Sequence, residues 1–353
     1  MKKITLLLFL VSYSLLRSTA AVLDNYVEIV YNGTSATVNV ASNISQYVTV
    51  SSGTSSHVKI VQSAAVDATN VGATTLGEIY YKLSGTSTDG EFYMEGAYKA
   101  TVILNGLTLT NPSGPAINIQ NGKRTAVSIT NGTTSTLTDG VNADYNGCFH
   151  SKGHTKFKGK GTLNVYGKSR HGIYSKEYVE MKNCTLNIKE AVKDAIHCQE
   201  YFLMESGTLN ISGAQDDGIQ VEYKGSYDAA TGTYTSERTG EISATSTIEA
   251  HEDENSANFY QSDGTLTISG VSGYAIKVAG TTIRYDGGTQ NFDTANTLIN
   301  ADETTSIVAI EKTASSESQF IYDLNGRRID AANLPKGISI VKTGNSVRKV
   351  FIR

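Results

Sequence analysis

The chain has 353 residues, of which 39% are hydrophobic, so it can bury a large core in one long domain or in two. Its formal net charge of −4 argues against non-specific binding to nucleic acid. Charged residues make up only 18% of the chain, whereas glycine contributes 33 residues and proline 3. With its long runs of Thr, Ser and Asn, this composition is typical of a turn-rich β protein and excludes a mainly helical one.

The first 20 residues have the pattern of a secretory signal peptide. Lys2 and Lys3 precede an apolar stretch over residues 4–16, and Ser18-Thr19-Ala20 offers small side chains for cleavage. The apolar stretch is too short to predict a membrane span, and no later segment predicts one. We therefore expect a protein exported through the periplasm and either secreted or held at the cell surface.

A short repeat runs through the middle of the chain. TLNV begins at 162, TLNI begins at 185 and again at 208, and TLTI begins at 265, after an insertion. Each repeat has three short strands of alternating apolar residues. A second set of anchor residues, which mark one position of each repeat, recurs at nearly the same spacing: Phe149, Ile173, Ile196 and Ile219. A period of about 23 residues with three strands predicts an all-β fold, a right-handed parallel β-helix with three strands per coil.

The remaining segments predict the domain organisation. Residues 21–99 are β-like without a clear register and are expected to form an N-terminal β region and cap. The β-helix is assigned to 100–293, a Ser/Thr-rich linker to 294–316, and a small C-terminal β unit to 317–353, with strands at 319–323, 337–342 and 347–352. The insertion carries HEDENS at residues 251–256, which we interpret as a solvated charged loop and not as a set of metal ligands.

Three aspartates are brought to one corner of the predicted helix. Residues at the same repeat position lie above one another on successive coils, which puts Asp194 and Asp217 in one column and Asp216 in the next. Three neighbouring carboxylates repel one another unless a cation shares them, and oxygen ligands suit Ca²⁺. We predict a calcium site here; the alternative is that these side chains only cap turns, with Lys193 neutralising part of the charge.

Other columns give candidate sugar contacts and structural features. The rings of His150, Tyr174 and His197 lie one position after the anchor residues of successive coils. We expect them to be exposed and to stack on sugar rings; the alternative is an ordinary solvent-facing surface. The outward Asn164, Asn187 and Asn210 predict an amide ladder. The candidate carbohydrate-binding residues are His150, Tyr174, His197, Lys152, Lys176, Arg170 and His171.

The three cysteines argue against a disulfide framework or a zinc site. Cys148, Cys184 and Cys198 are odd in number and have no CxxC spacing. One bridge is possible by count, but the sequence favours buried free thiols.

Charge is divided unevenly along the chain. Residues 152–193 hold ten Lys/Arg against three Glu, and residues 194–264 hold two Lys/Arg against fourteen Asp/Glu. A basic face beside an acidic edge suits an anionic polymer such as a uronate polysaccharide, in which lysines contact carboxylates and Ca²⁺ bridges acid to acid. The alternative is that the two blocks only balance each other.

Several segments resemble a known family. VILNGLTLTNPSGPAINI, FHSKG, HGIYSK, DAIHCQ and DDGIQVE are similar to segments of the secreted, calcium-binding, carbohydrate-binding β-helix proteins typified by clostridial members. The resemblance spans roughly residues 75–280 and implies a pectate-lyase-like fold that binds plant cell-wall polysaccharide, polygalacturonate included, without cutting it. Only Asp216-Asp217-Gly218-Ile219 keeps the family's Asp-Asp-Gly-Ile turn in full, so fewer calcium ions are expected.

The C-terminus resembles another known element. IYDLNGRRI at 321–329 and LPKGISIVK at 334–342 are similar to the sorting domain of the Bacteroidetes type IX (Por) secretion system. The resemblance implies secretion machinery as a partner; the alternative is a β tail that covers an open helix end.

These observations favour a non-catalytic protein that binds acidic, pectin-like polysaccharide with Ca²⁺. A polysaccharide lyase or polygalacturonase-like hydrolase and a structural adhesin are the alternatives. The hydrolase would use the three aspartates. In polygalacturonases, however, a His-Gly element follows the Asp pair and an Arg-Ile-Lys element comes later, whereas here His171-Gly172 precedes the pair and no later Arg-Ile-Lys element exists. No catalytic residue is therefore predicted.

Overall fold

The computed structural model describes residues 22–66, 77–142, 144–228, 233–236, 254–293 and 297–299, and the strands between 319 and 352. The expected signal peptide and most of the expected linker lie outside the described residues. Within the described part every regular element is a β-strand, and no helix there is long and apolar enough to cross a membrane.

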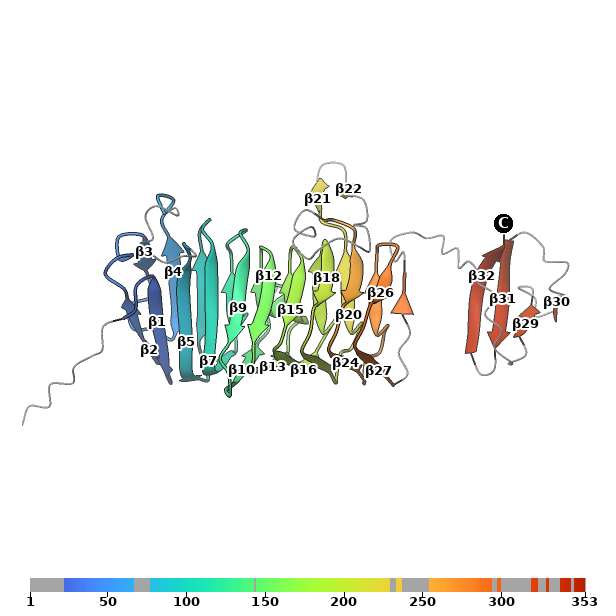
Figure 1. Cartoon of the computed structure of the whole chain (residues 1–353), viewed down its shortest axis with the longest axis horizontal. Helices are drawn as coiled ribbons and strands as arrows, with labels where there is room; N and C mark the ends of the chain where they lie inside the picture. Colours follow the sequence, from blue (N-terminus) through green and yellow to red (C-terminus); the bar gives the residue numbers. More distant parts are fainter. Residues whose placement is uncertain are drawn as a thin grey trace, which may run out of the picture.

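The main body is a parallel β-helix with three faces (Figure 1). Face 1 is a ten-stranded sheet. Its strands, in chain order, are β3 (Val48–Val50), β4 (His57–Gln62), β6 (Glu91–Glu95), β8 (Ile117–Ile119), β11 (Gly147–Ser151), β14 (His171–Ser175), β17 (Ile196–Gln199), β20 (Ile219–Glu222), β25 (Ile276–Val278) and β28 (Thr297–Leu298).

Faces 2 and 3 belong to one sixteen-stranded sheet. Face 2 contains β9 (Thr125–Ile129), β12 (Thr155–Gly159), β15 (Val179–Lys182), β18 (Tyr201–Met204), β23 (Asn258–Gln261) and β26 (Ile283–Tyr285). Face 3 contains β10 (Thr134–Asp139), β13 (Thr162–Gly167), β16 (Thr185–Ala191), β19 (Thr208–Ile211), β24 (Thr265–Ile268) and β27 (Thr289–Phe292).

A single long strand, β7 (Ala100–Asn111), joins faces 2 and 3. Its first part pairs with β9 and its last part with β10. Gly106 lies between the two parts with φ of 68°, a left-handed value that glycine adopts without a steric penalty. The chain therefore turns the corner here without ending the strand.

Strand pairing follows the repeat. Ile173 pairs with Ile196, Ile196 with Ile219, and Ile219 with Ile276. On face 3, Thr162, Thr185, Thr208 and Thr265 are also in register. Both anchors cross the insertion without losing register, which confirms the stacked coils predicted from the sequence.

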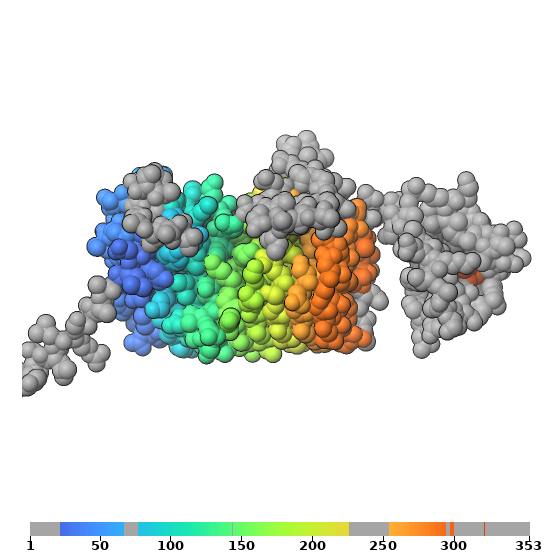
Figure 2. Space-filling view, in the orientation of Figure 1, coloured from blue at the N-terminus to red at the C-terminus, as the bar shows by residue number. Residues whose placement is uncertain are grey.

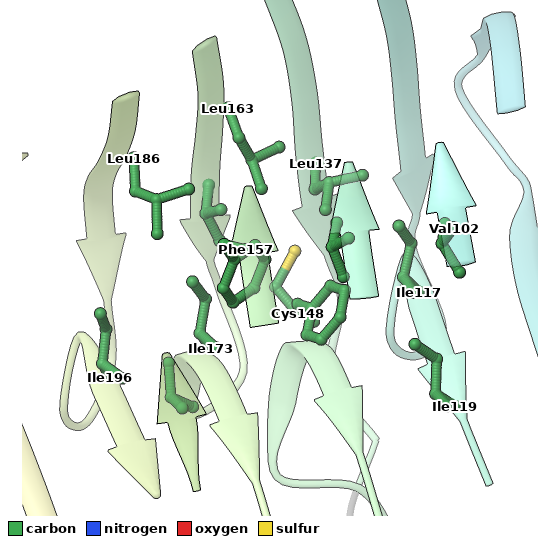
Figure 3. Packing of buried hydrophobic residues seen from close by; sticks show 14 of the residues in the cluster. Val102, Ile117, Ile119, Leu137, Cys148, Phe157, Leu163, Ile173, Leu186 and Ile196 are labelled. Carbon is green, nitrogen blue, oxygen red and sulfur yellow. The ribbon is translucent and has the colours of Figure 1, made fainter. Parts of the chain in front are cut away.

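The core is the inside of the coils (Figure 3). Inward residues such as Phe157, Leu186 and Ile196 have no exposed surface. Each large apolar side chain buried in this way contributes roughly 1.5–3 kcal/mol. Because the inner face of one coil is covered only by the others, the stack is the folding unit. All three cysteines are buried and free, as predicted.

The N-terminal region forms the first coils. β1 (Tyr26–Asn32) and β5 (Ile79–Ser87) pair in parallel with each other, and β5 pairs with β7, so parallel pairing begins well before residue 100. Antiparallel strands, β2 (Ser35–Val40) on β1 and β3 on β4, follow at this end. The described coils then succeed one another along the body in chain order (Figure 2).

Outward asparagines form the predicted amide ladder on face 3. Asn187 Nδ2 donates to Asn164 Oδ1 at 2.8 Å, and Asn210 Nδ2 donates to Asn187 Oδ1 at 2.9 Å. The identical side chains hydrogen-bond along the stack because strand spacing is about 4.8 Å.

Two further elements interrupt or follow the coils. The insertion begins with an antiparallel hairpin of β21 (Gly225–Asp228) and β22 (Thr233–Ser236). The predicted linker contains β28, which pairs with β25 of the helix. The C-terminal unit has β29 (Gln319–Tyr322), β30 (Arg328–Ile329), β31 (Gly337–Thr343) and β32 (Ser346–Ile352) in one antiparallel sheet, close to the expected strands.

Candidate functional site

The outer surface of face 1 carries most of the predicted site residues. His150 pairs with Tyr174 and Tyr174 with His197, so these three side chains form one column across β11, β14 and β17. The strands of face 1 begin at one corner of the helix and end at another. Both corners hold clusters of charged side chains.

The acidic corner, where the turns enter β17 and β20, consists of Asp194, Asp216 and Asp217. Their carboxylate oxygens lie within 4.8 Å of one another. The backbone N–H of Asp217 donates to Asp194 Oδ1 at 3.1 Å, which links the two coils directly. Asp194 and Asp217 are buried, whereas Asp216 is exposed. The structure thus brings together the three carboxylates that the repeat predicted.

The electrostatics of this corner reflect both repulsion and compensation. Partial burial and the neighbouring carboxylates of Asp217 and Asp194 raise the pKa of Asp216. Burial alone would raise the pKa of Asp194, but contacts with two imidazoles outweigh it and hold that pKa well below its usual range. Asp217 Oδ2 lies 3.1 Å from the ammonium of Lys277, which comes from the next coil.

The donor set at the acidic corner fits Ca²⁺ on one condition. Asp217 Oδ1 accepts the backbone N–H of Tyr274 at 2.7 Å. Asp217 Oδ2 is buried, has no regular hydrogen bond among the described residues, and lies against the Lys277 ammonium. The Lys277 side chain is 26% exposed and flexible. If it turns to solvent, oxygens of all three aspartates become available to a hard cation.

Two histidines also face this corner. Asp194 Oδ2 is 3.2 Å from His171 Nδ1 and 3.0 Å from His197 Nδ1. His197 Nε2 lies 3.3 Å from Glu222 Oε2. Burial disfavours the charged imidazolium of His197, but the carboxylates of Asp194 and Glu222 outweigh burial and raise its pKa to about 9. Burial lowers the pKa of His171.

The column of rings differs from the sequence expectation. We expected exposed rings, but only 6% of His150 and 9% of His197 is exposed. Tyr174 lies between them, with ring centroids 5.2 Å from His150 and 5.5 Å from His197 in stacked geometry. The rings cover one another's faces because the strand spacing suits aromatic stacking, so the expectation of exposed faces was wrong. Their outer edges remain on face 1.

The basic candidates lie beside this column. Lys152 and Lys176 follow paired residues of β11 and β14 and are both exposed. Within the described part of the chain neither ammonium group forms an ion pair. Their charges, together with burial as the larger cause, lower the pKa of His150 to about 4, so its imidazole is neutral. Arg170 is half-buried and donates to Asn146 Oδ1 at 2.6 Å.

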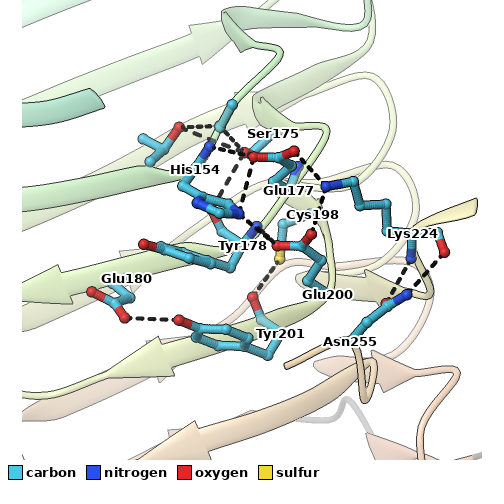
Figure 4. Close-up of polar contacts among 12 residues, drawn as sticks. His154, Ser175, Glu177, Tyr178, Glu180, Cys198, Glu200, Tyr201, Lys224 and Asn255 are labelled. Carbon is cyan, nitrogen blue, oxygen red and sulfur yellow. Dashed lines mark hydrogen bonds and ion pairs between the residues drawn. The ribbon is translucent and has the colours of Figure 1, made fainter. Parts of the chain in front are cut away.

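The second corner, which sequence reasoning missed, consists of His154, Glu177, Glu200 and Lys224 (Figure 4). His154 Nε2 is 3.0 Å from both Glu177 Oε2 and Glu200 Oε2. Lys224 Nζ contacts the other oxygen of each carboxylate, at 2.9 Å for Glu200. The two cations balance the two anions, and His154 stacks on Tyr178 with ring centroids 4.0 Å apart. This corner therefore forms a closed ionic network.

The acidic stretch of the insertion also differs from expectation. Residues 251–253 lie outside the described part, but Glu254 and Asn255 are buried. Glu254 Oε1 accepts the hydroxyls of Ser256 and Tyr260. The side chain of Asn255 accepts a hydrogen bond from the backbone N–H of Lys224 and donates one to its C=O. Our interpretation as a solvated charged loop was wrong for these two residues, whose hydrogen bonds hold the end of the insertion against the β-helix.

Comparison with known proteins agrees with this architecture. A family model for carbohydrate-binding domain-containing proteins matches residues 65–323. The chain belongs to this carbohydrate-binding family. A polysaccharide lyase-like protein from C. thermocellum, solved as a gadolinium derivative, matches with a TM-score of 0.50 and 17% identity over 78% of this chain and 99% of that one. A search of the curated proteins finds no match.

Membership of the carbohydrate-binding family makes carbohydrate the partner class of the chain. The structural likeness, at 17% identity, establishes a shared fold.

Proposed function

We propose that the protein is exported and binds an acidic, uronate-containing polysaccharide on face 1 without cutting it, with Ca²⁺ held at the acidic corner. The observation that carries this proposal is the pair Lys152 and Lys176. These ammonium groups lie on adjacent coils, are exposed, and have no carboxylate partner in the described part of the chain.

Two unpaired ammonium groups on adjacent coils favour an anionic ligand. Strands in a sheet are about 4.8 Å apart, so the two lysines start from neighbouring positions at that spacing. Like charges that close repel, and a polyanion lying along the helix relieves the repulsion at both positions. On face 2, by contrast, Lys156 pairs with Glu180 and Glu205.

Calcium extends the site along the same face. Bound by Asp194, Asp216 and Asp217, it would neutralise the acidic corner, which otherwise repels a uronate carboxylate. Because Ca²⁺ takes six to eight oxygen ligands, three aspartates leave positions for carboxylate or hydroxyl oxygens of the sugar. The lysines and the ion would then bind successive acidic groups of one polymer.

The side chains of face 1 support binding better than bond cleavage. A general base needs an available lone pair near the substrate. Arg170 already donates to Asn146, and the Asp194 carboxylate is enclosed by His171 and His197. A lyase or hydrolase activity and a structural adhesin without a sugar site are the outcomes against which binding must be tested.

Affinity electrophoresis in gels containing polygalacturonate tests this proposal. We expect retardation that weakens with chelator and with the double substitution Lys152→Ala/Lys176→Ala. Lys189→Ala, an exposed lysine on face 3, is the matched control and is expected to migrate as the wild type. Appearance of unsaturated ends or reducing sugar would instead establish an enzyme, and no retardation with any acidic glycan would favour an adhesin.

The signal peptide pattern of residues 1–20 supports export and a secreted or surface location. The C-terminal antiparallel sheet and its likeness to a type IX sorting domain support recognition by secretion machinery. Deletion of residues 317–353 is expected to leave the protein inside the producing cell, which fractionation would measure.

A further inference from the structure

His171, Asp194 and His197 form a compact cluster of metal-binding atoms. Asp194 Oδ2 is 3.2 Å from His171 Nδ1 and 3.0 Å from His197 Nδ1, and each of the three residues offers a ligand atom within 4.8 Å of those of the other two. The residues come from two adjacent coils and are buried, with exposed fractions of 6%, 2% and 9%. Four-coordinate Zn²⁺ with bonds of about 2.0 Å separates its ligand atoms by about 3.3 Å, close to the two distances seen here.

An orphaned nitrogen points into this cluster. His171 Nδ1 is fully buried and has no hydrogen-bond partner among the described residues. It lies 3.2 Å from Asp194 Oδ2 as an ion-pair contact, without a regular hydrogen bond. A buried polar atom without a hydrogen bond destabilises the fold, and a metal ion at this position would remove that cost.

The surroundings of His197 supply the contact that usually orients a metal-binding histidine. Its Nε2 lies 3.3 Å from Glu222 Oε2. A histidine that binds metal through one ring nitrogen commonly gives its other N–H to a carboxylate. His197 Nδ1 shares a hydrogen bond of 3.0 Å with Asp194 Oδ2, and a metal ion bound by both atoms would take the place of the proton in that bond.

The ligand types select the class of ion. Ca²⁺ prefers hard oxygen ligands, whereas imidazole with one carboxylate suits Zn²⁺ and related transition metals. Asp194 has one oxygen for each environment, since Oδ1 faces Asp217 and Oδ2 faces the two imidazoles.

We propose that His171, Asp194 and His197 form a transition-metal site of the Zn²⁺ type that links two coils at the end of face 1. It goes beyond the proposed polysaccharide binding and does not depend on it. The two proposed ions would share only Asp194, so they can be removed separately.

Zinc titration of the metal-stripped full-length protein, by calorimetry and by competition with a chromophoric chelator, tests this site. We expect saturable, stoichiometric binding that weakens at least 100-fold in His171→Gln. Glu222→Gln is expected to lose roughly 10–100-fold, as for other carboxylates that orient a metal-binding histidine. His57→Gln removes an exposed histidine far along the chain and is expected to bind zinc as the wild type does.

Two further measurements distinguish a loss of zinc binding from a loss of folding and from a loss of calcium binding. X-ray absorption of the zinc-loaded wild type is expected to show imidazole scattering, a result that needs no variant. Asp216→Asn is expected to weaken calcium binding and leave zinc binding unchanged, because Asp216 belongs only to the acidic corner. Absence of saturable zinc binding, absence of imidazole scattering, or unchanged zinc affinity in folded His171→Gln would overturn the proposal.

Discussion

The ionic network of the second corner predicts a pH-dependent contribution to stability. Burial alone would lower the pKa of His154, but its contacts with Glu177 and Glu200 outweigh burial and raise it from 6.5 to about 9. Because the folded pKa exceeds the unfolded one, protonated His154 stabilises the fold. That contribution is complete below pH 6.5 and is lost as the pH rises through about 9.

The magnitude follows from the shift. A difference of one pKa unit corresponds to about 1.4 kcal/mol, so the shift of His154 sets an upper limit of about 3 kcal/mol. The side chain is 24% exposed, so solvent screening is incomplete. We expect about 1–3 kcal/mol of the stability provided by His154 to disappear between pH 6.5 and about 9.5.

Urea denaturation of wild type and His154→Gln, followed by circular dichroism across this pH range, measures the effect. The difference between the two proteins is the informative quantity, because other groups also titrate here, including His197, whose pKa is likewise raised to about 9. These contributions cancel in the subtraction. A difference in unfolding free energy that stays constant from pH 6.5 to 9.5 would refute the network as described.

Three further predictions test the corner, the ladder and the core. Lys277→Met removes the ammonium beside Asp217 and is expected to tighten Ca²⁺ binding in calorimetry, whereas an unchanged or weaker affinity would place the ion elsewhere. Asn187→Ala removes two side-chain hydrogen bonds of the ladder and should lower the free energy of unfolding by about 1–3 kcal/mol in urea denaturation; a change near zero would make the ladder energetically neutral. Ile196→Ala leaves a cavity inside the coils and should cost about 2–5 kcal/mol, measured in the same way; a cost below about 1 kcal/mol would contradict tight packing there.

Much of the fold was predictable because one period governs it. The regular spacing places residues in columns, and the columns then locate the Asn187 ladder and the contact between Asp194 and Asp217. These features depend only on repeat position, which a sequence displays directly. The parallel coils before residue 100 have no such spacing, so β1 and β5 were recognised only as β-like.

The charged partners were harder to predict because they depend on how turns direct side chains. Glu177 and Glu200 are one full repeat apart, and this spacing could have identified their column. Lys224, however, lies at the start of the insertion, where the period gives no guidance. Lys277 pairs with Gln220 on the coil before it and could have been found by carrying the register across the insertion.

Ring burial could not be derived from the repeat. The spacing places His150, Tyr174 and His197 in one column but does not say whether their faces point outward or at one another. Which of the two occurs depends on the side-chain rotamers, which the repeat does not specify. Sugar contacts on face 1 are therefore better sought at ring edges and at the lysines than at ring faces.

Calcium-dependent binding of polygalacturonate by wild type, Asp216→Asn and Lys152→Ala/Lys176→Ala, measured in the same buffer with and without chelator, tests the central claim most directly. We predict that the wild type binds in calcium and loses affinity with chelator. Asp216→Asn should bind weakly in both conditions, and the lysine variant should lose affinity while keeping its calcium site. Equal affinity of all three proteins in both conditions would contradict a polysaccharide site on face 1.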